Sequence, residues 1–134
     1  MNTHTTLIRL LGAIRDHLAV AEPAGEIVSI QAEISYLDGD SITVHLRGGT
    51  LAELAGDLLG WAYTLGLPTV TVWRVPDGGR VHLTVCGRLV DEAVEIYGGV
   101  TYDPDVFGVD LQPGGQHGVA LGVLRSWAGL GVAA

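Results

Sequence analysis

The side chains best suited to chemistry in this chain are two histidines and a group of aspartates. His45 and His82 lie in segments that alternate like strands, so they would meet only on the open face of a sheet. Asp103, Asp105 and Asp110 fall within one short stretch. Imidazoles bind Zn²⁺, and carboxylate oxygens bind Mg²⁺ or Ca²⁺. We therefore take these five residues as a candidate site at the open face of the sheet.

The spacing of these residues matches no metal motif. No two of the five histidines have the local spacing of a zinc site, and the aspartates lack the glycine and glutamate of an EF-hand loop. Aspartates on either side of Pro104 are ordinary turn residues. We assign no metal, cofactor or catalytic residue from the sequence.

Other catalytic motifs are also missing. There is no Gly-x-Ser-x-Gly segment, and the chain has no lysine that could make one of its double glycines a P-loop. The single cysteine, Cys86, is read as a small buried hydrophobe. The sequence therefore favours a protein that is not an enzyme. The alternative hypothesis is a small enzyme or ligand-binding protein with a pocket on the open sheet face.

The composition predicts one soluble domain, residues 1–134, that contacts another chain. A net charge of −8 argues against direct nucleic-acid binding and favours a basic partner. An apolar fraction of 48% with a mean hydropathy of +0.37 is high for a monomer, so we expect a homodimer. No apolar run approaches the roughly 20 residues of a membrane helix, and no basic leader is present, so we expect a cytoplasmic protein without membrane contact.

The basic residues carry a further signal about origin. All seven are arginine, and the chain holds 20 glycines. This bias is typical of a GC-rich bacterial or phage genome, and it does not bear on function.

The best-specified element is a helix that begins after Thr50. Thr50 and Glu53 have the spacing of a capping box, in which each side chain accepts a backbone N–H of the first turn. Apolar residues then recur every three or four positions, namely Leu51, Leu54, Leu58, Ala62 and Leu65. We predict that the helix ends at Gly66, in a left-handed conformation, with Leu67 folded back and Pro68 preventing continuation.

The residue pattern before this helix predicts another helix followed by a hairpin. Residues Thr5 to Ala21 form a helix whose apolar stripe is Leu7, Leu11, Ile14 and Leu18. Two alternating segments, 28–36 and 42–47, then pair as antiparallel strands. A three-residue loop of Leu37, Asp38 and Gly39, with Gly39 left-handed, sets Ile34 opposite Ile42 and Ala32 opposite Val44.

A second hairpin, 69–75 with 80–87, has two possible registers. With Pro76 and Asp77 in a type I turn and Gly78 left-handed, Trp73 shares the buried face with Leu83. With a four-residue loop, Trp73 instead lies opposite His82 on the other face. The turn residues favour the first register.

The remainder of the chain is less regular. A strand at 94–97 is expected to end at Gly98-Gly99, and residues 102–118 are read as loop with at most a short extended piece at 106–111. A short helix follows from Val119 to Ala128. The predicted class is α+β, an antiparallel sheet of about five strands with helices packed on it, in the order α-β-β-α-β-β-β-α.

These features lead to two functional hypotheses. The first is a non-enzymatic, homodimeric protein-binding module, with Trp61, Trp127 and Arg125 as candidate partner-binding residues, because exposed tryptophan beside arginine is typical of interfaces. In size, charge and alternation of elements the chain resembles secretion chaperones and phage-encoded inhibitors, although it has two strands rather than three before the central helix. The second is a small enzyme or ligand-binding protein with the open-face site described above.

Overall fold

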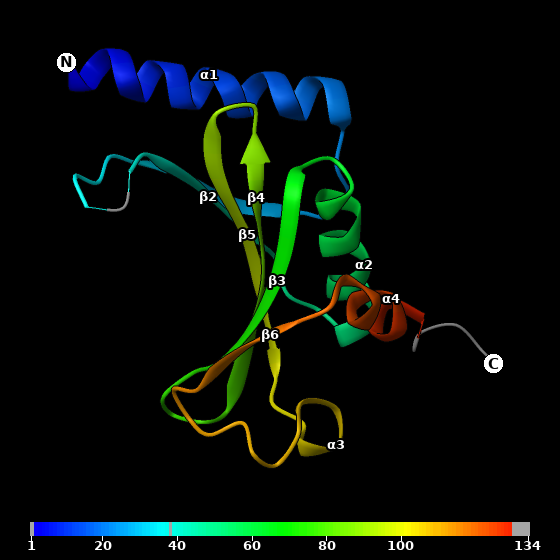
Figure 1. Ribbon diagram of the computed structural model, residues 1–134. Coiled ribbons are helices and arrows are strands. Elements are labelled where there is room, and N and C mark those ends of the chain that lie inside the picture. The colour runs from blue at the N-terminus through cyan, green and yellow to red at the C-terminus, as the bar shows by residue number, and fades with distance from the viewer. Residues whose placement is uncertain (1, 38, 130–134) are drawn as a thin grey trace.

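The structure is a computed structural model that describes residues 2–37 and 39–129. Within these residues, six strands form one sheet in the order β1-β2-β5-β4-β3-β6, and helices cover one of its faces (Figure 1). The elements along the chain are α1 (Thr3–Ala21), β1 (Ile27–Glu33), β2 (Ser41–Leu46), α2 (Leu51–Ala62), β3 (Gly66–Arg74), β4 (Arg80–Leu89), β5 (Glu92–Thr101), α3 (Pro104–Phe107), β6 (Gln116–Val119) and α4 (Leu121–Gly129).

The α+β class is confirmed, but the predicted sheet is wrong in two details. β5 lies between β2 and β4 and runs parallel to β2, so the sheet is mixed rather than antiparallel. β6 adds a sixth strand at the edge beside β3, inside the stretch that we expected to be loop. Both pairings join segments far apart in the chain, which local patterns do not reveal.

The start of α2 is as predicted. The Thr50 side chain accepts a hydrogen bond from the Glu53 backbone N–H at 3.1 Å, and the Glu53 carboxylate accepts one from the Thr50 N–H at 3.2 Å. The helix ends earlier than expected, at Ala62. Gly66 already pairs with Arg88 in the sheet, and Leu67 rather than Gly66 has a positive φ, of 51°.

The buried face of α1 differs from the prediction. The fully or nearly buried positions are Thr6, Leu10 and Ile14, while Leu11 is 49% exposed. The stripe therefore passes through Leu10 and not Leu11. Among the described residues, no helix has both the length and the apolar character needed to cross a membrane.

The first hairpin keeps the predicted faces but not the predicted register. Ala32 pairs with Ile42, and Ile30 with Val44, a shift of two residues from the expected pairs. Because side chains alternate with a period of two, this shift leaves the same residues facing the core. The connection is longer than three residues; Gly39 is left-handed as predicted, with φ of 83°, and Asp38 lies outside the described residues.

The second hairpin adopts the register that we did not favour. The Val75 N–H donates to the Arg80 carbonyl at 2.9 Å, so the loop holds four residues and Trp73 lies opposite His82. Gly78 is left-handed, with φ of 83°, as the turn residues indicate. Gly79 also belongs to the loop, since β4 begins at Arg80, and its N–H donates to the Asp77 carboxylate at 2.8 Å. This register turns Val70 and Val72 toward the helices.

β5 does not end at its double glycine. Gly98 and Gly99 continue the strand and are buried. α2 packs closely on Gly98, where an added Cβ would lie 2.6 Å from Leu54 Cδ1. The last helix begins at Leu121, since Val119 belongs to β6.

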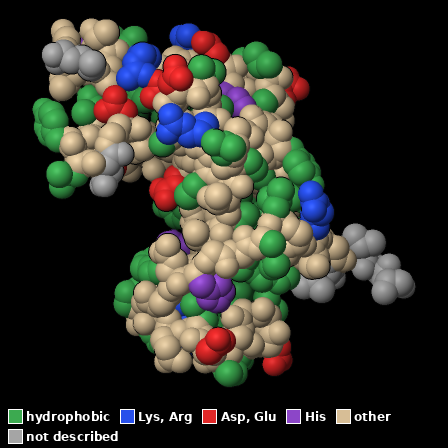
Figure 2. Space-filling view, viewed as in Figure 1, with side chains coloured by type: hydrophobic (Ala, Val, Ile, Leu, Met, Phe, Trp, Pro, Cys, Tyr) green, Lys and Arg blue, Asp and Glu red, His purple; other side chains and the backbone are tan. Residues whose placement is uncertain are grey.

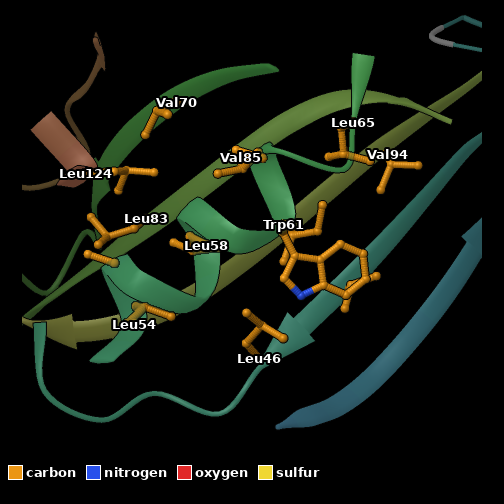
Figure 3. Close-up of a cluster of buried hydrophobic side chains, with 14 of the residues drawn as sticks. Leu46, Leu54, Leu58, Trp61, Leu65, Val70, Leu83, Val85, Val94 and Leu124 are labelled. Carbon is orange, nitrogen blue, oxygen red and sulfur yellow. The ribbon is translucent and has the colours of Figure 1, made fainter. Parts of the chain in front are cut away.

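The core lies between the sheet and α2, with α4 beside it (Figure 3). Leu10 and Ile14 of α1 belong to the same buried cluster. Trp61, Leu54 and Leu58 from α2 meet Leu83 and other β-strand side chains of the helix-covered face. The opposite face of the sheet faces away from these helices (Figure 1).

Candidate functional site

Four aromatic rings form a continuous row on the open face of the sheet, and we call this row the ring ladder. It consists of His45 on β2, Tyr97 on β5, His82 on β4 and Trp73 on β3. The His45 and Tyr97 rings are stacked, with centroids 4.5 Å apart and planes 2° apart. Tyr97 lies 5.3 Å from His82, which lies 5.2 Å from Trp73 in an edge-to-face contact. The ladder therefore crosses the four central strands of the sheet.

Strand pairing explains this arrangement. His45 and Tyr97 are partners in the parallel β2–β5 pair, and His82 and Trp73 are partners in the antiparallel β4–β3 pair. The Tyr97–His82 contact is diagonal, because the residue directly opposite His82 is Gly99. A diagonal neighbour is within reach of an aromatic side chain. The missing side chain at Gly99 thus lets the two pairs join.

The surroundings of His82 lower the pKa of its imidazole. Burial lowers the pKa of His82, and the neighbouring His45 and Arg80 lower it further. Both histidine rings contact Tyr97, so each has an aromatic neighbour. The ladder is accordingly a half-buried aromatic surface on which protonation of His82 is disfavoured.

Cys86 also lies on the open face, and the prediction of a core cysteine is wrong. Its strand partner is Glu95, and its Sγ donates to the Glu95 carboxylate at 3.8 Å. Burial raises the pKa of the Cys86 thiol, and the Glu95 charge and this hydrogen bond raise it further. A thiol kept protonated is a poor nucleophile.

Charges of both signs surround the ladder. The strand residues with open-face parity include Glu33 and Glu95 as well as Arg80 and Arg88. These two carboxylates and two guanidinium groups offset each other. The open face is therefore close to neutral, although the whole chain carries a charge of −8.

The structure brings together only part of the predicted open-face site. His45 and His82 lie on either side of Tyr97. The three aspartates instead lie after β5, in and around the short helix α3. Asp103 caps α3 by accepting the Asp105 N–H at 2.9 Å. Throughout residues 2–37 and 39–129, no group of three or more His, Cys, Asp or Glu side chains could hold a metal ion.

The predicted partner-binding residues do not form one surface. Trp61 is completely buried, with its Nε1 donating to the Ala24 carbonyl at 3.1 Å, so the prediction that it is an exposed anchor is wrong. Trp127 is half-buried against Phe107, at 5.3 Å between ring centroids. Arg125 is exposed and donates to the Tyr63 hydroxyl at 2.8 Å.

Sequence reasoning missed Tyr97 and Trp73 as site residues. The signal for Trp73 was present in the four-residue loop, which puts it opposite His82. Tyr97 had no such signal, because its contact with His45 depends on the parallel pairing of β2 and β5.

Comparisons of this chain with family models, curated proteins and solved structures found no match.

Proposed function

We propose that this protein is a non-enzymatic, cytoplasmic protein-binding module that forms a homodimer through the open face of its sheet. In this respect it would act as secretion chaperones or phage-encoded inhibitors do, by holding another chain rather than transforming a substrate. The observation that carries the proposal is the ring ladder on a sheet face that none of the described helices covers.

The ladder has the properties of an interface centre. Tyrosine and tryptophan supply a large contact area with few rotatable bonds, so little conformational entropy is lost when they are covered. His45, Tyr97 and His82 already restrain one another by ring contacts, which orders the surface in advance. Sheets pack face to face at about 10 Å, with their side chains between them.

The near-neutral charge of the open face supports a second copy of this chain as the partner that covers it. Two chains that each carry −8 repel, but this face is close to neutral. In a two-fold arrangement Arg80 of one protomer can approach Glu95 of its partner. The aromatic centre is then flanked by opposite charges rather than like ones.

The test is to measure mass by light scattering across a hundredfold range of concentration. We expect a dimer that becomes monomeric in the double variant Trp73→Ser, Tyr97→Ser, with an unchanged far-ultraviolet circular dichroism spectrum. Tyr63→Ser is the matched control, because Tyr63 is an exposed aromatic residue outside the open face, and this variant should remain dimeric. A native protein that is monomeric throughout, or a ladder variant that stays dimeric, would refute the proposal.

A ligand-binding role on the same face is the second candidate. It is favoured by one observation, the two imidazoles that contact Tyr97 from opposite sides. If Zn²⁺ raises the thermal midpoint of the native protein and not that of His45→Ala or His82→Ala, the ligand-binding role is supported. If the midpoint is unchanged by metal, this role loses its support.

A further inference from the structure

Arg80 differs from the other arginines of this chain, because it has no partner among the residues that the structure describes. All seven basic residues are arginine. The partners of the other six are carboxylates for Arg9, Arg15 and Arg47, backbone carbonyls for Arg74 and Arg88, and the Tyr63 hydroxyl for Arg125. Around α1, arginine and acidic side chains lie next to one another (Figure 2). The guanidinium of Arg80 on the open face is not balanced in this way.

The guanidinium of Arg80 lies over the backbone of Gly99. Relative to the position that a Cβ on Gly99 would take, Arg80 Nη2 is 3.0 Å away and Arg80 Nε is 3.3 Å away. The Cδ2 atom of the His82 ring lies 3.5 Å from the same position. Arg80 and His82 therefore converge over a residue of β5 that has no side chain to separate them.

Further polar groups on the open face also lack a partner. Within residues 2–37 and 39–129, no hydrogen bond is made by the ring nitrogens of His45 or His82 or by the Tyr97 hydroxyl. None of the described side-chain nitrogens or oxygens is both fully buried and without a hydrogen bond, so these groups reach solvent. A ligand with charged oxygens can accept hydrogen bonds here without displacing a contact within the chain.

The carboxylates of the open face lie at its other end. Glu33 and Arg88 belong to one row of strand partners, and Glu95 belongs to the next row. Glu95 is the partner of Cys86, which is six residues from Arg80 on β4, or roughly 20 Å in an extended strand. The Debye length is about 8 Å at physiological ionic strength, so salt screens these carboxylates from Arg80. The face is close to neutral as a whole, but its Arg80 end is positive.

Two aspartates are closer to Arg80 along the chain or across the sheet, but they have other roles. Asp77 and Asp103 each accept a backbone N–H of their own loop, at 2.8 Å and 2.9 Å. Neither forms an ion pair with Arg80 within the described part of the chain. Burial lowers the pKa of His82, and His45 and Arg80 lower it further, in agreement with an electropositive site.

We propose that Arg80 and His82 bind an oxyanion, such as a carboxylate or phosphate group, over Gly99. Nε and Nη2 lie on one edge of the guanidinium, and such an edge binds two oxygens through parallel hydrogen bonds. His82 supplies a further donor. The oxyanion can belong to a free ligand or to Glu95 of a second copy, and only the second source rests on the proposed homodimer.

The probe is inorganic sulfate, an oxyanion whose charge is constant near neutral pH. Sulfate is added to the full-length, isotope-labelled protein, with sodium chloride at equal ionic strength as the control. Nuclear magnetic resonance follows the imidazole signals of His82, which are identified by their loss in His82→Asn. We expect a saturable shift with sulfate only. A bound anion favours the protonated imidazole, so sulfate should raise the pKa of His82 and bind more tightly as the pH falls from about 7.5 to 6.

Arg80→Gln has a matched control in Arg88→Gln. Both arginines are exposed residues of β4 on the open face, but Arg88 already donates to the Asp91 carbonyl. Arg80→Gln should weaken sulfate binding by roughly tenfold or more, because a charged pair of donors is lost. Arg88→Gln should leave the affinity nearly unchanged. The thermal midpoint of both variants in chloride verifies that they fold.

Glu95→Gln separates the two sources of the oxyanion. If Glu95 of a second copy fills the site, Glu95→Gln and added sulfate should each lower the light-scattering mass of the dimer. If the ligand is free, neither should change the mass. A native protein that is monomeric throughout would refute the homodimer, and the sulfate titration would still decide whether this site exists.

Three outcomes would overturn the oxyanion site. They are no saturable shift of the His82 signals in sulfate, equal shifts in sulfate and chloride, or equal sulfate affinity of Arg80→Gln and Arg88→Gln. Each of these outcomes can be observed whether or not the protein forms a dimer.

Discussion

The two faces of the central sheet are built from the same strands, but their side chains differ in burial. They therefore differ in how much stability a substitution removes. On the helix-covered face, Leu83 and Val85 are fully buried, and their neighbours come from α2. On the open face, the intervening residues Thr84 and Cys86 are half-buried, and their partners in the sheet are residues of β3 and β5. Alternation thus gives one strand a face that is buried against the helices and a face that is only partly buried.

The largest expected effect tests this difference at adjacent positions of β4. Leu83→Ala leaves a cavity against α2 and should lower the free energy of unfolding by about 2–5 kcal/mol. Thr84→Ala, one residue along on the open face, should change it by about 0.5 kcal/mol or less. Urea denaturation of both variants measures the contrast, and equal losses would mean that the open face is also a packed interior.

The two adjacent glycines of β5 give a smaller effect of the same kind. An added Cβ at Gly98 meets Leu54 at 2.6 Å inside the core, so Gly98→Ala should cost about 1–3 kcal/mol. At Gly99 the nearest atom is Arg80 Nη2, at 3.0 Å on a side chain that can move. Gly99→Ala should therefore leave the thermal midpoint nearly unchanged; a large fall would show that the open face tolerates no added volume.

The smallest effect is the response of the open face to acid. Burial lowers the pKa of His82 in the folded chain, so the unfolded chain takes up this proton at a higher pH. Stability should then fall as the pH drops from about 7 to 5.5, through the usual range of histidine. In His82→Asn the loss of stability with acid should be shallower. The part of the loss that is due to His17, whose pKa burial also lowers, should remain. An unchanged slope would assign the acid response to other groups.

The candidate site was predictable only in part. The alternation of both hairpins put His45 and His82 on the open face, and this is where they lie. Their shared contact with Tyr97 was not predictable, because β5 joins the sheet between β2 and β4 only after α2 and two further strands. Trp61 was misjudged for a related reason: the helix-covered face extends far enough to bury it completely.

By itself, the sequence determined the features that depend on a few neighbouring residues. The capping box at Thr50 and Glu53, the left-handed Gly39 and Gly78, and the alternating faces of the hairpin strands follow from local hydrogen bonds and backbone sterics. Tertiary structure decided the strand order, the registers, the length of β5 and the ring ladder. These depend on contacts between distant segments, and the burial of the strands against α2 selects one pairing among several that are locally acceptable.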